Sequence, residues 1–340
     1  MNIWRTLFLL PILLSLSSCS DPVQSVWADY QTRLSRVTSV EFPPVASLPL
    51  TSLPSISQLR QPVAELELSL LNMLALRRCG LDQLVGERNS SLGKVQSVSQ
   101  RFRYESKFLQ QVQPCLSPVV LDKDLTAQLL TMSRRKAADM PKQWLNLLML
   151  DPTLRQQFQP AAEPLPLSGQ AGLTQSLQAL HQLLAIQQLV NDQQWRLLSE
   201  QNAEQALALL YQSGFLSRWL HSLYRHLEFL SQTQAALDQH PIEQFCPTGK
   251  AHGKAEVLQG VLTKVFISRI QQPLAELDGA YQQFWPLLTA LYQKSPLWPA
   301  LQQRFEQPLL KLKQQLRLHV AWWQQVQHQC AAPALNAETH

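Results

Sequence analysis

The chain has 340 residues with 29 basic and 24 acidic side chains, so its formal net charge of +5 is mild for its length. It contains only 10 glycines, is dense in Leu and Gln, and places its apolar residues mostly at helical spacing, with no convincing alternating run. These features exclude a β-rich protein and predict an all-α fold, an elongated bundle of long amphipathic helices.

The first 18 residues have the pattern of a secretory signal. Arg5 stands before an apolar run from Leu7 to Leu16, and the small residues Ser17 and Ser18 follow. The run is about ten residues long, whereas a helix that crosses a bilayer needs about 20. We therefore interpret residues 1–18 as a signal peptide that targets the chain for export.

Residues 16–19, Leu-Ser-Ser-Cys, look like the bacterial lipobox, in which the signal is cut before the cysteine and the thiol carries a diacylglycerol. Several acyl chains on Cys19 would anchor the chain stably; the alternative is an ordinary signal with an incidental cysteine. Ser20 follows the cysteine and Asp21 comes only after it, which by analogy with lipoprotein sorting signals favours the outer membrane. The sequence thus predicts a lipid-anchored protein on the periplasmic face of a bacterial membrane, where no nucleic-acid partner is expected.

The next segment predicts a short helix and then an extended spacer. Asp21-Pro22 can cap and open a helix that runs to about Val37. Prolines at positions 43, 44, 49, 54 and 62 forbid a helix over residues 41–62 and favour an extended strap across the bundle surface. Residues 19–61 are therefore expected to hold the lipidated N-terminus, one helix and this Pro-rich spacer.

Helical segments occupy the rest of the chain, with one internal break. The Pro-rich segment at 160–172 can separate an N-terminal helical lobe, residues 62–159, from a C-terminal long-helix lobe, residues 173–330. The first lobe is predicted to contain a helix opened by Pro62, a loop over 86–98, a helix that stops before Pro114, and helices over 122–138 and 141–150. The second is predicted to contain helices over 173–212, 215–239, 254–294 with kinks at Pro273 and Pro286, and 298–329. Residues 331–340 are interpreted as a disordered tail.

Four cysteines remain beyond the lipobox, namely Cys79, Cys115, Cys246 and Cys330. An even number in an oxidising compartment predicts two disulfides, and three connectivities are open. If the last two long helices run antiparallel, Cys246 and Cys330 arrive at the same end of the bundle. This geometry favours the sequence-local pairs, Cys79 with Cys115 and Cys246 with Cys330.

The stretch GERNSSLGKV at 86–95 invites comparison with a phosphate-binding loop, but its spacing is wrong. That loop needs four residues between its glycines and a hydroxyl after the lysine, whereas here six residues separate Gly86 from Gly93 and Val95 follows Lys94. The S-x-x-K matches at 91–94 and 133–136 lack the partner motifs of acylating enzymes. We therefore assign no catalytic residues here.

The eight histidines do not predict a metal site. His221 and His226 are about 140° apart around a helix and cannot face one ion. His319 falls on an apolar stripe, where a hydrogen-bonded core histidine is expected. The sequence therefore predicts no metal ligands and no cofactor.

A local charge bias suggests a binding surface. Between Arg60 and Lys142 there are 13 basic and 8 acidic residues, and several of them surround the 86–98 loop. One reading is a solvated face with Asn and Ser side chains that cap neighbouring helices. The other is a site for an anion such as a phosphate or carboxylate. Its candidate residues are Arg78, Arg88, Asn89, Ser90, Ser91, Lys94 and Arg101.

These residues also carry a resemblance. Arg78-Cys79-Gly80-Leu81, Glu87-Arg88-Asn89-Ser90-Ser91-Leu92-Gly93-Lys94, Ser99-Gln100, Tyr104-Glu105 and Pro114-Cys115 together resemble an uncharacterised family of Gram-negative bacterial lipoproteins, classed only as a domain of unknown function. The resemblance covers nearly all of the chain after the signal and implies a lipoprotein. It implies no activity, cofactor or catalytic residue.

Three classes of function stay open from the sequence. The leading hypothesis is a non-catalytic interaction or structural component of the envelope, which binds another envelope protein. The second is a module that binds an anionic small ligand at the Arg88–Lys94 loop. The third is an unrecognised enzyme of the cell envelope, with Glu105 or His240 as acid or base.

Overall fold

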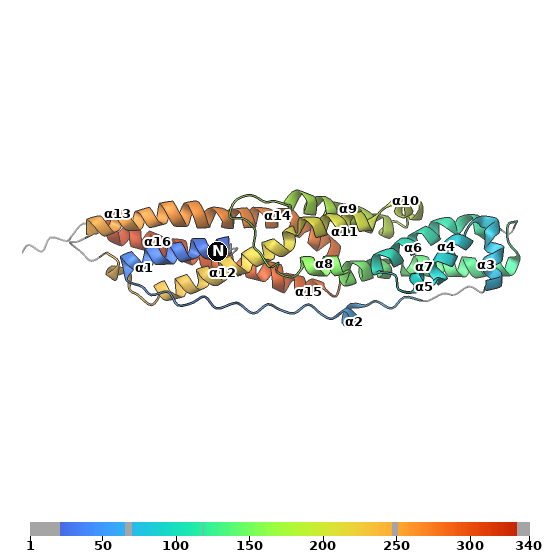
Figure 1. Ribbon diagram of the computed structural model, residues 1–340, viewed down its shortest axis with the longest axis horizontal. Coiled ribbons are helices and arrows are strands. Elements are labelled where there is room, and N and C mark those ends of the chain that lie inside the picture. Colours follow the sequence, from blue (N-terminus) through green and yellow to red (C-terminus); the bar gives the residue numbers. More distant parts are fainter. Residues whose placement is uncertain (1–20, 65–69, 118, 247–250, 332–340) are drawn as a thin grey trace, which may run out of the picture.

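The computed structural model describes residues 21–64, 70–117, 119–246 and 251–331. These residues form a rod of helices that run mostly along its long axis (Figure 1), with no strand among them. The all-α fold class predicted from the sequence is confirmed. The signal peptide, Cys19 and the tail at 332–340 lie outside the described residues.

The bounds of the α-helices show how the rod is assembled. In chain order they are α1 Pro22–Thr38, α2 Ile56–Leu59, α3 Leu70–Leu76, α4 Asp82–Asn89, α5 Ser91–Lys94, α6 Val98–Gln111, α7 Lys123–Leu150, α8 Pro152–Gln157, α9 Leu173–Asn191, α10 Trp195–Glu200, α11 Ala203–Ser213, α12 Phe215–Leu237, α13 Ala251–Val261, α14 Gln272–Tyr292, α15 Trp298–Leu301 and α16 Gln307–Ala331. α12 packs along α16, α9 lies between α11 and α14, and α6 packs on α7.

The first helix forms as the sequence predicts. Asp21 Oδ1 accepts hydrogen bonds from the amides of Val23 and Gln24, at 2.9 and 3.2 Å, and Pro22 occupies the first helical position. One stripe of α1 is buried, namely Val23, Val26, Trp27, Tyr30 and Leu34. Ser39 ends the helix in a left-handed conformation, with φ at 63°.

Residues 41–62, which we call the strap, run along the flank of the rod (Figure 1) and are extended apart from the single turn of α2. Because an extended segment forms few hydrogen bonds within itself, its backbone N–H and C=O groups need other partners. Side chains of the bundle provide some of them. Glu228 accepts from the Leu48 amide at 2.8 Å, and Arg304 donates to the Thr51 carbonyl at 2.7 Å. The predicted Pro-rich strap is therefore present, and hydrogen bonds attach it to α12 and to Arg304.

Three helix boundaries expected from the sequence are wrong. The helix expected to open at Pro62 does not begin there, since residues 61–64 are not helical, and Gly80, with a positive φ of 75°, interrupts the helical path before α4. α7 continues through Pro141 instead of dividing at residues 138–141, because buried residues on both sides of the proline hold the helix together against a cost of about 3 kcal/mol. The single helix expected over 173–212 is instead broken, since Gln193 adopts a positive φ of 54°. The chain then folds back, so that α11 packs on α9.

Two π-helical segments mark where prolines enter long helices. η4 (Leu262–Gln271) and η5 (Gln302–Glu306) each end two residues before a proline, Pro273 and Pro308. Proline lacks an N–H group and its ring crowds the carbonyl of the preceding turn. A locally wider turn accommodates both effects, so the helical path from α13 into α14 passes Pro273 without a break.

The buried side chains divide into two clusters. The larger one extends along most of the rod, from Val23 to Val326, and includes residues on both sides of the 160–172 segment. The smaller one is formed at one end of the rod by residues between Leu76 and Leu129. We call residues 70–117 and 119–129 the tip lobe. A division into lobes at 160–172 stays a prediction.

Candidate functional site

The residues that carry the family resemblance gather in the tip lobe, at the end of the rod away from α13 (Figure 1). This region is therefore the candidate functional site. Its side chains fall into two groups. One group builds the lobe, and the other is exposed on its surface.

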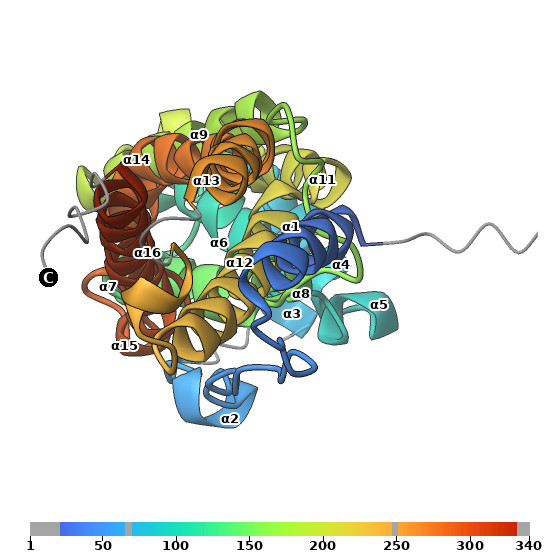
Figure 2. The same ribbon diagram turned by 90° about the vertical axis from the view of Figure 1, so that its left-hand side faces the viewer.

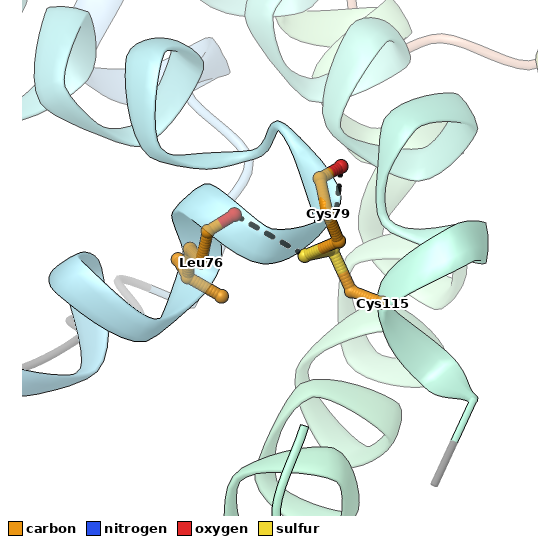
Figure 3. Close-up of a disulfide and its surroundings, with 3 residues drawn as sticks. All are labelled: Leu76, Cys79 and Cys115. Atoms are coloured by element: carbon orange, nitrogen blue, oxygen red, sulfur yellow. Dashed lines mark hydrogen bonds between the residues drawn. A yellow bond between two sulfur atoms is a disulfide. The ribbon is translucent and has the colours of Figure 1, made fainter. Parts of the chain in front are cut away.

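A disulfide joins two of the signature segments. Cys79 and Cys115 are bonded (Figure 3), with their Cα atoms 5.2 Å apart. Gly80 ends the short 3-10 helix η1 (Arg77–Cys79) with φ at 75°. Cys79 Sγ lies 3.3 Å from the carbonyl oxygen of Leu76. A disulfide sulfur has no hydrogen to donate, so this is a packing contact. The bond ties the segment after α3 to the chain that leaves α6.

The second disulfide, Cys246–Cys330, has the same Cα separation of 5.2 Å and fastens the end of α16 to the segment before α13. It lies at the opposite end of the rod from the tip lobe (Figure 1). Both bonds are the sequence-local pairs that the antiparallel helix arrangement favours. One disulfide thus cross-links the chain near each end of the rod.

The segment at 86–98, expected to be a loop, contains the last turn of α4 and all of α5. Ser90 Oγ donates to the Glu87 carbonyl at 2.7 Å and accepts from the Gly93 amide at 3.1 Å. Arg88 Nη1 donates to the Gly93 carbonyl. A Cβ on Gly93 would clash with the carbonyl oxygens of Glu87 and Arg88, which explains why glycine stands there. The correction has a local cause: hydroxyl and guanidinium groups cap the turn between two short helices.

Glu105 of α6 and Lys136 of α7 form a buried ion pair. The distance between Lys136 Nζ and Glu105 Oε2 is 2.6 Å, and the two side chains are 8 % and 7 % exposed. Lys136 Nζ also lies 5.4 and 5.0 Å from the ring centres of Tyr104 and Phe108. Burial, with a smaller contribution from Glu105, raises the pKa of the Tyr104 hydroxyl. Glu105 is therefore engaged by a cation in the lobe interior.

Some of the residues predicted to bind an anion already form hydrogen bonds within the protein. Arg88 and Ser90 bond to the backbone of their own turn, and Asn89 Nδ2 lies 3.6 Å from Met73 Sδ. Arg78, Asn89, Ser90 and Ser91 are exposed, and Arg101 is half-buried and has interactions of its own. The side chain of Lys94 lies outside the described part of the molecule. Binding of an anion here stays a prediction.

His226 is a buried polar residue of the core that the sequence did not predict. Trp27 Nε1 donates to His226 Nδ1 at 3.0 Å, so that ring carries its proton on Nε2. Burial lowers the pKa of His226 to about 4, although nearby Asp21 acts in the opposite direction. The sequence held one hint of this hydrogen bond: Trp27 lies on the buried stripe of α1, and a buried indole N–H needs an acceptor.

His319 belongs to a longer chain of hydrogen bonds. Trp323 Nε1 donates to the Tyr30 hydroxyl at 2.9 Å, and that hydroxyl lies 2.6 Å from His319 Nε2. Because indole can only donate, Tyr30 in turn donates to His319, whose Nδ1–H donates to Gln234 Oε1 at 2.8 Å. Burial lowers the pKa of His319 to about 3. The expected hydrogen-bonded core histidine is confirmed.

Neither a metal centre nor a bilayer-crossing helix is found in the part of the chain that the structure describes. No three His, Cys, Asp or Glu side chains there are placed to hold an ion. No helix there is both long and apolar enough to cross a membrane.

Comparison with known proteins gives a family but no activity. The family model described as Protein of unknown function (DUF3080) matches residues 27–333, which span the tip lobe, both disulfides and α16. No curated protein and no solved structure matches the chain. Since the match covers most of the sequence, the chain belongs to the family described as Protein of unknown function (DUF3080).

Proposed function

We propose that the protein is a lipid-anchored component of the bacterial envelope. The signal is cut before Cys19, the thiol is acylated, and the rod lies on the periplasmic face of a membrane, the outer membrane being favoured. The Leu-Ser-Ser-Cys sequence at 16–19 supports this proposal. The two disulfides support it too, because such bonds form and persist in oxidising compartments.

The anchor is tested by intact mass analysis of protein purified from its own host membranes. Lipidation at Cys19 adds the mass of the acylated glyceryl group to a chain that starts at that residue. A Cys19→Ala variant should leave the membrane fraction. Recovery of an unacylated N-terminus from wild-type protein would contradict the proposal.

We further propose that the rod works as a non-catalytic interaction component, with the tip lobe as its contact surface. The observation that carries this proposal is the exposure of the signature segment. While Ser90 and Gly93 complete the turn, Asn89 and Ser91 are exposed, and Val95, four residues after Ser91, is 78 % exposed. An exposed apolar side chain with polar neighbours has the arrangement of a small protein contact, an apolar centre with a polar rim.

Photo-crosslinking in intact cells tests this surface. A photoreactive residue at Val95 should capture one envelope protein, and the same protein should be captured from Ser91. Val257 on α13 is the matched control, since it is also an exposed valine, 51 % accessible, but lies at the other end of the rod. Equal capture from both valines, or none from Val95 and Ser91, would count against a contact at the tip lobe.

A further inference from the structure

The N-terminal residue of the folded body is held rigidly. Asp21 Oδ1 caps α1, while its Oδ2 accepts from Arg225 Nε of α12 at 3.0 Å. Arg225 is itself fixed by Glu228 at 2.7 Å, and these two side chains are 19 % and 5 % exposed. A residue with capping bonds on one oxygen and a half-buried ion pair on the other moves with the bundle.

The distance from this point to the proposed lipid is very short. Only Ser20 lies between Cys19 and Asp21. Two successive Cα–Cα steps span at most about 7.6 Å. No spacer therefore separates the acylated residue from the rigid body, and the strap that could have acted as one lies after α1 and is bound along the rod.

The attachment point lies on the flank of the rod and not at either end. In Figure 1 the start of α1 lies between the two ends, and in Figure 2 α1 lies on the outside of the bundle. From there α1 runs toward the α13 end along the rod. Its 17 residues cover about 25 Å at about 1.5 Å per residue.

We infer that the flank bearing α1 is a lipid-facing surface, so that the rod lies along the membrane and does not stand on it. This inference rests on the proposed lipidation of Cys19. An upright rod would drive the arm formed by α1, with Arg33 and Arg36 near its end, into the bilayer, where charged side chains are costly. The chain from Cys19 to Asp21 reaches about 8 Å, and α1 is about 25 Å long. The long axis of the rod can therefore tilt toward the membrane by roughly 20° before the end of α1 enters the bilayer.

The chemistry of this flank fits a headgroup surface. The exposed positions in the first three turns of α1 include Gln24, Ser25, Ala28 and Thr32, which carry no charge. The charge of the partly exposed Asp29 is paired with Arg33 and Arg269, at 2.8 and 2.6 Å. The uncharged positions can approach zwitterionic or anionic lipids without repulsion. The tip lobe is then also held close to the same membrane, so its partner must be reachable from that surface.

The test uses the full lipidated protein in vesicles of phosphatidylethanolamine and phosphatidylglycerol. A photoreactive residue at Ala28 should label lipid several-fold more than one at Gln324. Gln324 is exposed on α16 and lies about 140° around that helix from His319, which faces α1, so it points away from the proposed surface. Equal lipid labelling at the two positions would overturn the inference.

A linker variant separates this inference from the proposal on which it rests. About ten Gly/Ser residues inserted between Ser20 and Asp21 give a coil of roughly 17 Å and should lower labelling at Ala28 to the level at Gln324. Mass analysis of the same samples reports acylation of Cys19. If Cys19 is acylated but labelling at Ala28 is low or indifferent to the linker, only the orientation is wrong. If Cys19 is not acylated, the proposed anchoring fails.

Discussion

A buried ion pair joins Glu105 of the tip lobe, which belongs to the family signature, to Lys136 farther along α7. Removing one partner of a buried pair leaves the other charge uncompensated, which costs about 3–5 kcal/mol. Replacing both partners by apolar side chains of similar size avoids that cost. The pair therefore offers a direct test of what the Tyr104-Glu105 signature does.

We expect Lys136→Met to lower the free energy of unfolding by about 3–5 kcal/mol, as measured by urea titration. The matched control is Lys142→Met on the same helix. Its ion pair with Asp139 leaves Lys142 46 % exposed, so about 0–1 kcal/mol should be lost. The double variant Glu105→Leu with Lys136→Met should be more stable than Lys136→Met alone. Equal effects of Lys136→Met and Lys142→Met would show that the pair is not a structural element of the lobe.

His226 and His319 make the stability of the rod depend on pH. Their pKa values in the folded protein are about 4 and about 3, below the ordinary value of 6.5. The unfolded chain therefore binds more protons in acid, and the stability that these rings contribute is present above pH 6.5 and lost as pH falls toward their folded pKa values. The expected slope is up to about 1.4 kcal/mol per pH unit for each ring.

Replacing His319 by Gln should remove one such contribution from the slope of unfolding free energy between pH 6 and 4, measured by denaturant titration at each pH. His328→Gln is the control, because this histidine is exposed on the same helix and should leave the slope unchanged. A wild-type slope in the His319→Gln variant would contradict the buried, neutral state of that ring.

At the scale of elements, local sequence signals predicted where some helices and the strap begin and end. The other boundaries depend on contacts between distant parts of the chain. Asp21-Pro22 specifies the start of α1, and clustered prolines specify the strap. The break at Gln193 has only a weak local signal, the Asn191-Asp192 pair before it, and the return of α11 onto α9 is a long-range contact that the sequence pattern does not show. The candidate site shows the same contrast between local and long-range information. The disulfide pairs could be predicted from the directions of the helices, but the pairing of Glu105 with Lys136 depends on how α6 packs on α7, which the sequence pattern does not show.

The strap is held by side chains of distant helices, and this predicts where it can be loosened. Glu228→Ala removes the acceptor of the Leu48 amide, so amide exchange in a peptide covering residues 44–54 should become faster, as measured by mass spectrometry. Glu243→Ala is the control, because this exposed carboxylate lies in the segment after α12. Unchanged exchange at 44–54 in Glu228→Ala would mean that other contacts suffice to hold the strap.

At the scale of the whole molecule, the two buried clusters predict two units of stability. The Cys79–Cys115 bond closes a loop with a sequence separation of 36 within the tip lobe, and such a loop is worth about 3–4 kcal/mol on the chain-entropy model. Replacing both cysteines by Ala should accelerate amide exchange in the tip lobe, while α12 and α16, which belong to the larger cluster, keep their protection.

The Cys246→Ala, Cys330→Ala variant is the counterpart at the other end of the rod. It should accelerate exchange near the start of α13 and the end of α16 and leave the tip lobe protected. If either variant loosens the whole rod uniformly, the two clusters unfold as one unit.

The order in which a ribosome makes the chain gives the core a further property. Trp27 and Tyr30 emerge early, but their hydrogen-bond partners His226 and His319 follow 199 and 289 residues later. Trp27 can be covered once α12 has been made, whereas the Tyr30 hydroxyl has to wait for His319 on α16. A product truncated before α16 would lack the partners of the Tyr30 hydroxyl, so this part of α1 should be more accessible to proteases until the end of the chain is made.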